Sequence, residues 1–204
     1  MRDFGHWSWR YARDRSFLLA YEITHRGWPW LCPDANAYLA NALETESTCF
    51  EWGSGRSTIW LAKRVNRLVS IEHDETWLNH VERRLGLLRS HGVELQRVSE
   101  EERPYVEPID AFTQDSIDIV LVDGISKFRD SCALAALPKI RSGGIIMVDD
   151  IQRYLPSSSV SPGSIGPKSD PSTPAWSEFV HETADWNCHW FSSGVTDTAI
   201  WERP

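Results

Sequence analysis

The chain has 204 residues, a formal net charge of −8 and four cysteines, and 41% of its residues are hydrophobic. This length and composition predict one folded domain with an apolar core and exclude collagen-like and low-complexity chains. The acidic balance disfavours a general nucleic-acid binder and suits a neutral or cationic small ligand. No apolar run approaches the roughly 18 residues of a membrane span, and no signal-like stretch or CxxC pair is present. We therefore expect a cytoplasmic protein with reduced thiols.

The N-terminal part is predicted to be helical. Residues 6–27 place Trp, Tyr, Phe and Leu between charged residues at roughly helical spacing. Pro33 then opens a second helix over residues 34–43. We interpret residues 1–45 as a helical extension that acts as a lid, and residues 46–204 as the main domain.

The main domain alternates between short apolar runs and helical segments. The expected strands are 48–52, 67–72, 93–98, 117–122 and 144–148, and the expected helices are 56–65, 75–91 and 131–140. Strands that lack polar alternation and are separated by helices indicate a parallel sheet covered on both faces. This pattern predicts a doubly wound α/β domain.

The C-terminal part begins with a long loop. Residues 155–174 are rich in Ser, Pro and Gly, which predicts a flexible loop or a functional lid. A helix over 175–184 follows. Two runs, 186–191 and 196–202, are joined without a crossover helix around Gly194, so we expect them to be antiparallel. The whole sheet would have seven strands, mostly parallel, with an antiparallel C-terminal strand.

A glycine-containing turn follows the first expected strand. The turn Glu51–Thr58 reads EWGSGRST; glycines there let a ligand approach the backbone, and a helix N-terminus offers free N–H groups. Alone, this pattern fits a plain tight turn equally well. Glu72 ends the next strand about 20 residues after Gly53, where an acid can bind ribose hydroxyls. The two signals together predict a nucleoside-containing ligand, and Thr58 in place of a third glycine disfavours a dinucleotide.

Acidic residues end several of the expected strands. Ligands of open α/β sheets bind outside the carboxyl ends of the strands, where Glu51, Glu72, Asp123, Asp149 and Asp150 would converge. So many acids repel one another unless a sulfonium, an ammonium or a divalent metal lies among them. Capping of a helix N-terminus is the alternative for one of the aspartates.

Several of these motifs resemble a known family. Residues 48–74 are similar to the first two motifs of class I S-adenosylmethionine-dependent methyltransferases, which have a Rossmann-like fold. The runs IDIVLVDG (117–124) and GGIIMVDD (143–150) resemble that family's fourth- and fifth-strand motifs, and residues 188–204 resemble its terminal strand pair. The resemblance implies methyl transfer to a small-molecule acceptor, and an oxygen is the acceptor atom that we expect.

The resemblance also implies a set of cofactor-binding residues. Glu72 would bind the ribose hydroxyls with His73 beside the adenine, and Asp123 would lie near the methionine amino group or the transferred methyl. Ser99 and Glu100 would lie near the adenine edge. The full set implied for S-adenosylmethionine is Glu51, Gly53, Ser54, Gly55, Ser57, Thr58, Glu72, His73, Ser99, Glu100 and Asp123.

The resemblance leaves the catalytic groups with two alternatives. Some O-methyltransferases of this class hold a divalent metal with acids after strands four and five, and Asp123, Asp149 and Asp150 match those positions in type. Mg²⁺ or another hard cation would suit such ligands. In a metal-free site, Asp150, Lys127 or Arg153 would contact the substrate. The candidates for removing the acceptor's proton are Asp123, Lys127 and Asp150.

Other classes stay open at this point. The chain could be an inactive cofactor-binding module or a nucleotide-dependent oxidoreductase, whereas its charge disfavours a nucleic-acid methyltransferase. Arg129 is interpreted as a surface arginine that could bind an anionic group. Tryptophans near the N-terminus and Trp176 could line a pocket, although core packing or a homodimer contact is the more common role of such residues. The expected partners are a small-molecule substrate and, as an open alternative, a second copy of the chain.

Overall fold

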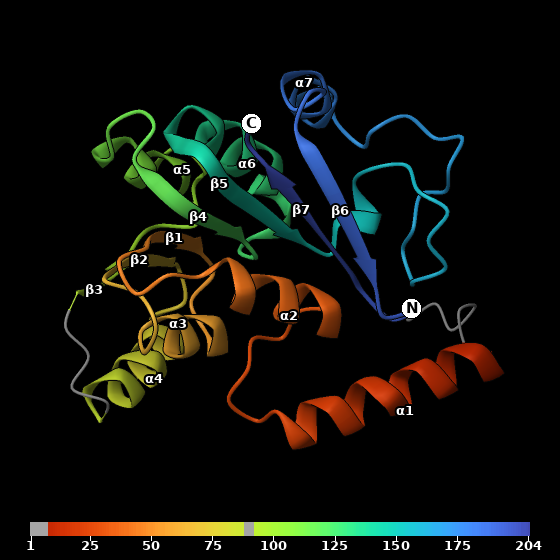
Figure 1. Cartoon of the computed structure of the whole chain (residues 1–204), viewed down its shortest axis with the longest axis horizontal. Helices are drawn as coiled ribbons and strands as arrows, with labels where there is room; N and C mark the ends of the chain where they lie inside the picture. Colours follow the sequence, from red (N-terminus) through yellow and green to blue (C-terminus); the bar gives the residue numbers. More distant parts are fainter. Residues whose placement is uncertain (1–7, 88–91) are drawn as a thin grey trace.

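A seven-stranded sheet in the order β3-β2-β1-β4-β5-β7-β6 forms the centre of the computed structural model, which describes residues 8–87 and 92–204 (Figure 1). The strands are β1 Thr48–Trp52, β2 Arg67–Glu72, β3 Val93–Arg97, β4 Ile117–Val122, β5 Ile140–Asp149, β6 Asn187–Ser192 and β7 Asp197–Glu202. Strands β1 to β5 pair in parallel, and β7 is antiparallel to both β5 and β6. The predicted mostly parallel sheet with an antiparallel C-terminal strand is confirmed.

Helices cover both faces of this sheet. They are α1 Trp9–Thr24, α2 Pro33–Ala42, α3 Arg56–Leu61, α4 Glu75–Gly86, α5 Glu102–Val106, α6 Arg129–Ala136 and α7 Pro174–Glu182. Helices α2, α3 and α4 lie on one side and α5, α6 and α7 on the other (Figure 1). The residues of β1 explain why both faces are covered. Cys49 packs in the apolar cluster on the α2, α3 and α4 side, and Phe50 and Trp52 pack in the cluster on the α5, α6 and α7 side. Apolar residues at successive positions thus supply both faces.

The two N-terminal helices differ in how they pack. Ala35 and Leu39 of α2 are buried in the same cluster as Cys49 and Met147, so α2 is part of the core that covers the sheet. Helix α1 lies farther out (Figure 1), and Leu18 is its buried residue. The exposed apolar residues of α1 are Trp9, Phe17, Leu19 and Ile23.

Some element bounds differ from those that the periodicity predicted. The helix expected over 131–140 begins at Arg129 and ends at Ala136, because Pro138 cannot continue it and the chain forms a 3₁₀ turn, η3 Leu137–Lys139. Short elements that the sequence did not reveal are α5 and three further 3₁₀ turns, η1 Glu107–Ala111, η2 Ser126–Phe128 and η4 Ile151–Arg153. The last residues of the helix expected over 75–91 and the first of the one expected over 6–27 lie outside the described residues.

The loop over 155–174 is tied to the main domain at several points. Ser161 Oγ donates to the buried Asp197 carboxylate at 2.6 Å, and the Ser172 amide donates to the Tyr154 carbonyl at 2.8 Å. Arg10 of α1 donates to the Val160 carbonyl at 2.9 Å. The loop and α1 therefore contact each other beside the sheet.

Two further expectations concern membranes and thiols. Within the described ranges, none of the helices is both long and apolar enough to cross a bilayer. Cys49 and Cys132 are buried free thiols, as predicted, and Cys32 is buried too, while Cys188 on β6 is exposed.

Candidate functional site

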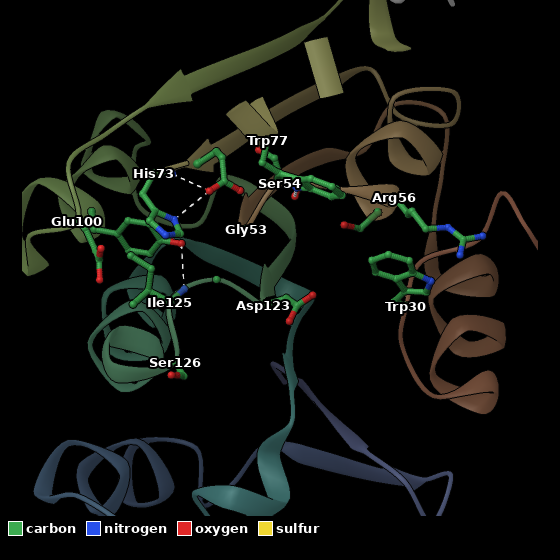
Figure 2. Close-up of a pocket in the computed structure, with 15 residues that line it drawn as sticks. Trp30, Gly53, Ser54, Arg56, His73, Trp77, Glu100, Asp123, Ile125 and Ser126 are labelled. Carbon is green, nitrogen blue, oxygen red and sulfur yellow. Dashed lines mark hydrogen bonds and ion pairs between the residues drawn. The ribbon is translucent and has the colours of Figure 1, made fainter. Parts of the chain in front are cut away.

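A cavity of about 450 Å³ opens at the carboxyl ends of β1, β2 and β4 (Figure 2). Strand β1 has β2 on one side and β4 on the other, so the order of the strands reverses here. Such a switch point is where open α/β sheets bind their ligands. The lining residues are Trp30, Gly53, Ser54, Gly55, Arg56, Ser57, Glu72, His73, Trp77, Glu100, Tyr105, Asp123, Gly124, Ile125 and Ser126.

The turn after β1 requires glycine at its first position. Gly53 has a φ of +96°, and a Cβ there would lie 2.8 Å from the carbonyl carbon and oxygen of Asp123. The Gly53 amide donates to the Ile71 carbonyl at 2.9 Å. The turn is therefore pressed between the ends of β2 and β4, and this close approach presents Ser54 and Gly55 to the cavity.

Glu51 and Thr58 hold this turn from behind and do not line the cavity. Glu51 is fully buried, and its Oε2 accepts hydrogen bonds from Thr58 Oγ1 at 2.5 Å and Ser70 Oγ at 2.7 Å. Thr58 Oγ1 in turn accepts from the Gly55 amide at 2.7 Å. Burial raises the pKa of Glu51, although these hydroxyls and Ser57 lower it. Among the described residues, Glu51 Oε1 has no hydrogen-bond partner.

Glu72 lines the cavity at the carboxyl end of β2. Its Oε1 accepts from the amides of His73 at 2.8 Å and Asp74 at 2.9 Å, which fixes the carboxylate at the end of β2. His73 Nδ1 lies 2.9 Å from the same oxygen. Trp77 Nε1 donates to the Ser54 carbonyl at 2.6 Å, so the indole joins the glycine turn to α4 and closes one side (Figure 2).

Tyr105 and the turn after β4 form the opposite wall. Tyr105 Oη accepts from the Ile125 amide at 3.2 Å, and its ring meets the His73 ring edge-on with centroids 6.1 Å apart. A Cβ on Gly124 would lie 1.9 Å from Tyr105 Oη, so the tyrosine uses the space that this glycine leaves. Glu100 stands beside His73 at this end (Figure 2).

Arg56 connects the cavity to the N-terminal segment. Its guanidinium carbon lies 5.2 Å from the centroid of the Trp30 ring, and its Nη2 donates to the His25 carbonyl at 3.3 Å. Both side chains stand at the same end of the cavity (Figure 2). The segment after α1 therefore borders the cavity mouth.

Arg129 lies among the acids that follow β4 and β5. Its Nη2 is 3.0 Å from Asp123 Oδ1, and its Nη1 donates to the Asp149 carbonyl at 2.5 Å. Nη1 also lies 3.9 Å from Asp150 Oδ2. The residue is only 7% exposed, so its interpretation as a surface arginine is wrong. As the first residue of α6, it points inward, under the sheet edge.

The three aspartates have protein partners of their own. Asp149 Oδ1 accepts from Thr198 Oγ1 at 2.6 Å, and Asp150 Oδ1 accepts from Thr196 Oγ1 at 2.7 Å. Burial raises the pKa of Asp123 to about 7; Arg129 lowers it, and Asp150 raises it further. Burial and the neighbouring acids Asp123 and Asp150 raise the pKa of Asp149 well above its usual range.

These residues do not fit a divalent metal, which is one of the two alternatives that the sequence leaves open for Asp123, Asp149 and Asp150. A hard cation needs several oxygens that converge on one point. Here a permanent positive charge, the Arg129 guanidinium, already contacts this group, and two of the carboxylates accept threonine hydroxyls. In the described part of the chain, no group of three or more His, Cys, Asp or Glu side chains is placed to hold a metal.

Two other expected catalytic or substrate-binding groups lie outside the cavity lining. Lys127 is more than half exposed, and its Nζ lies 3.3 Å from Glu100 Oε1. Arg153 is also more than half exposed, with Nη2 3.5 Å from Asp150 Oδ2. Lys127, Arg153 and Asp150 are not among the lining residues, so Asp123 is the one of the three proton-accepting candidates that lines the cavity.

The sequence anticipated about half of the lining. The expected residues that do line the cavity are Gly53, Ser54, Gly55, Ser57, Glu72, His73, Glu100 and Asp123. Ser99 does not line it. The lining residues that the sequence motifs do not predict are Trp30, Arg56, Trp77, Tyr105, Gly124, Ile125 and Ser126. Of these, Trp77 had a usable signal, because it occupies the first turn of the helix that follows Glu72.

Comparisons with known proteins find methyltransferases. Residues 50–151 match the family model described as a methyltransferase domain. An O-methyltransferase from Bacillus cereus, solved in complex with SAH, is 16% identical with a TM-score of 0.61, and the match covers 97% of this chain and 92% of that one. An rRNA methylase from Streptococcus thermophilus is also 16% identical, with a TM-score of 0.57 and coverage of 82% and 92%. No curated protein matches the sequence.

Proposed function

The chain belongs to the class I S-adenosylmethionine-dependent methyltransferases, and we propose that its methyl acceptor is an oxygen atom of a small molecule. The observation that carries the proposal is the cavity that runs from Glu72 to Asp123 across the glycine turn. Its volume of about 450 Å³ lies in the range of small-molecule sites. Two further observations support a small acceptor. The net charge is −8, and the likeness to the O-methyltransferase extends over 97% of the chain, N-terminal helices included.

Several lining residues support S-adenosylmethionine as the ligand of this cavity. Glu72 would bind the ribose hydroxyls, because His73 and Asp74 fix one of its oxygens and leave the other for a ligand. His73 and Glu100 would flank the adenine. The turn at Gly53 packs against the Asp123 carbonyl with no room for a side chain, which supports the placement of Ser54 and Gly55 along the ligand. A cationic ligand would also suit the raised pKa of Asp123, since a nearby positive charge favours the ionised carboxylate.

The chemistry asks two things of this chain. S-adenosylmethionine, when bound, supplies a methyl group on an activated sulfonium carbon. The chain must hold an acceptor hydroxyl in line with that carbon and take up the proton that the hydroxyl loses. Asp123 lines the cavity, and its pKa near neutrality suits a proton acceptor. Ser126, in the same turn after β4, is placed to orient the acceptor.

Titration calorimetry tests the cofactor half of the proposal. We expect S-adenosylmethionine and S-adenosylhomocysteine to bind and NAD not to bind. Glu72→Gln should weaken both by about tenfold or more, because a charged hydrogen bond to the ribose is lost. Glu82→Gln, an exposed acid on α4, is the matched control and should bind like the wild type. Equal affinity in Glu72→Gln would refute the ribose assignment.

Methyl transfer from radiolabelled S-adenosylmethionine tests the acceptor half. The panel contains phenolic and alcoholic small molecules, amines and purified rRNA. We expect the label in a base-stable ether of a hydroxylated small molecule. Label in rRNA, or only in an amine, would contradict the proposed acceptor while leaving the methyltransferase assignment intact.

A further inference from the structure

We propose that the Arg129 side chain is a built-in cation that occupies the position of a divalent metal, so that this site works without one. The inference concerns three acids at the sheet edge, Asp123, Asp149 and Asp150, which come from the ends of β4 and β5. Its part about the acceptor rests on the proposed function. Its part about metal binding stands on the geometry alone.

All three nitrogens of the Arg129 guanidinium donate hydrogen bonds to residues that end or follow β4 and β5. Nε donates to the Gly124 carbonyl at 3.1 Å, and Nη2 donates to the Asp123 carbonyl at 3.2 Å as well as to its carboxylate. Nη1 donates to the Asp149 carbonyl at 2.5 Å. A planar fork with five N–H donors can satisfy such a set, whereas an ammonium group cannot.

The surrounding charges show why a cation is needed there. Asp123 and Asp150 face Arg129 from two sides, and Arg153 approaches Asp150 from the solvent side. Asp149 is 6% exposed and has a neutral partner, the Thr198 hydroxyl. Without Arg129, Asp123 would lose its ion-pair partner, Asp149 would keep only the Thr198 hydroxyl, and Asp150 would keep Thr196 and the exposed Arg153. Leaving charge uncompensated in a partly buried group is costly.

The same arrangement disfavours a metal at this point. A divalent ion held by Asp123 and Asp150 would have to lie close to the guanidinium, and like charges in a poorly solvated site repel strongly. The threonine hydroxyls would also have to release their carboxylate oxygens. The cation is therefore supplied by the chain itself and does not depend on metal concentration.

A consequence follows for the acceptor. A metal centre selects acceptors that present two neighbouring oxygens to the ion. A site built around Arg129 imposes no such chelation, so a single hydroxyl beside Asp123 is sufficient. We infer that the acceptor class is a monohydroxylated small molecule and that a vicinal diol gains no advantage from its second oxygen.

Metal binding is tested without any substrate. The wild type, Arg129→Gln, Arg129→Lys and the control Arg103→Gln, an exposed arginine that pairs with Glu107 away from the three acids, are mixed with Mn²⁺, and bound Mn²⁺ is measured by electron paramagnetic resonance. Thermal unfolding is recorded with and without Mg²⁺. For the wild type, Arg129→Lys and Arg103→Gln, we expect no bound Mn²⁺ and no change in Tm when Mg²⁺ is added.

Arg129→Gln should behave differently. Removing one partner of a buried charge group should lower its Tm by roughly 10 °C, and added Mg²⁺ should recover part of that loss. A merely structural arginine would give the loss without the recovery, and that result would overturn the proposal. Bound Mn²⁺ in the wild type would overturn it too, and this measurement decides the matter if Arg129→Gln does not fold.

Turnover gives a separate readout. Once an acceptor has been identified, we expect EDTA to leave wild-type activity unchanged. We also expect a catechol to be methylated no faster than its monohydroxylated analogue. Loss of activity with EDTA, restored by Mg²⁺, would refute the inference. Failure to bind S-adenosylmethionine at all would refute the proposed function and leave the Mn²⁺ result standing.

Discussion

Arg129 Nη2 and Asp123 Oδ1 lie 3.0 Å apart, yet the two side chains differ sharply in access to solvent, with 8% of the Arg129 side chain and 32% of the Asp123 side chain exposed. The arginine is sealed beneath the sheet edge, while the aspartate lines the cavity. One carboxylate is thus anchored by a buried cation on one side and open to a ligand on the other. This relationship makes Asp123 the residue on which the chemistry is best tested.

Asp123→Asn should lower kcat by about 10² or more, because an amide cannot take up the acceptor's proton. S-adenosylhomocysteine should still bind within about tenfold of the wild type. The measurement is steady-state methyl transfer, paired with calorimetry. Asp110→Asn, an exposed aspartate near Lys139, is the control. Nearly normal turnover in Asp123→Asn would remove it from the mechanism.

Activity should rise with pH through about 7. Burial raises the pKa of Asp123 to about 7, so below that pH the carboxyl is protonated and cannot act as a base. The profile of kcat/KM for S-adenosylmethionine against pH, which reports the free enzyme, should therefore have an ascending limb centred near neutrality, and Asp123→Asn should lack it. A flat wild-type profile between pH 5 and 8 would show that another group takes the proton.

Gly53→Ala should damage the cofactor turn. A Cβ at this position would lie 2.8 Å from the Asp123 carbonyl, and the φ of +96° is strained for alanine. We expect a loss of about 1–3 kcal/mol in unfolding free energy and a marked loss of S-adenosylmethionine binding. Gly86→Ala in α4 has open space and should be neutral or stabilising. Both are measured by denaturant titration and calorimetry, and unchanged binding in Gly53→Ala would contradict the expectation.

Thr58→Val should weaken the turn from behind. The hydroxyl donates to buried Glu51 and accepts from the Gly55 amide, so its loss leaves both groups short of a partner. We expect a loss of about 1–3 kcal/mol in unfolding free energy together with weaker cofactor binding. The exposed Thr45→Val is the control. If stability falls but binding does not, Thr58 supports the core and not the cofactor turn.

The strands and the placement of the acids were predictable for a simple reason. Runs such as 117–122 are apolar at nearly every position, and burial on both faces of a parallel sheet requires that pattern. Once the strands are placed, their carboxyl ends fix which acids share an edge. Glu72 and Asp123 were found at the cavity on that basis alone.

The role of individual side chains depended on distant parts of the chain. Arg129 begins a helix as any solvated arginine could, and only the carbonyls of Gly124 and Asp149 reveal why it is buried. In the sequence, Thr58 is informative only because it replaces a third glycine. In the structure, its hydroxyl links the Gly55 amide to the Glu51 carboxylate and so holds the turn in place. Tyr105 lies in a short helix that periodicity does not detect. Such contacts follow from tertiary packing, which local sequence does not encode.

The position of β1 has a consequence for the working cycle. In the sheet, β1 joins a small wing, β2 and β3, to a large wing that starts at β4, and the cavity takes Glu72 from the first wing and Asp123 from the second. A molecule bound in the cavity therefore contacts both wings and stabilises the folded state by its binding free energy. Release of product removes this stabilisation. Amide hydrogen exchange between β1 and β2 and between β1 and β4 should therefore be slow in the bound state and faster in the free state.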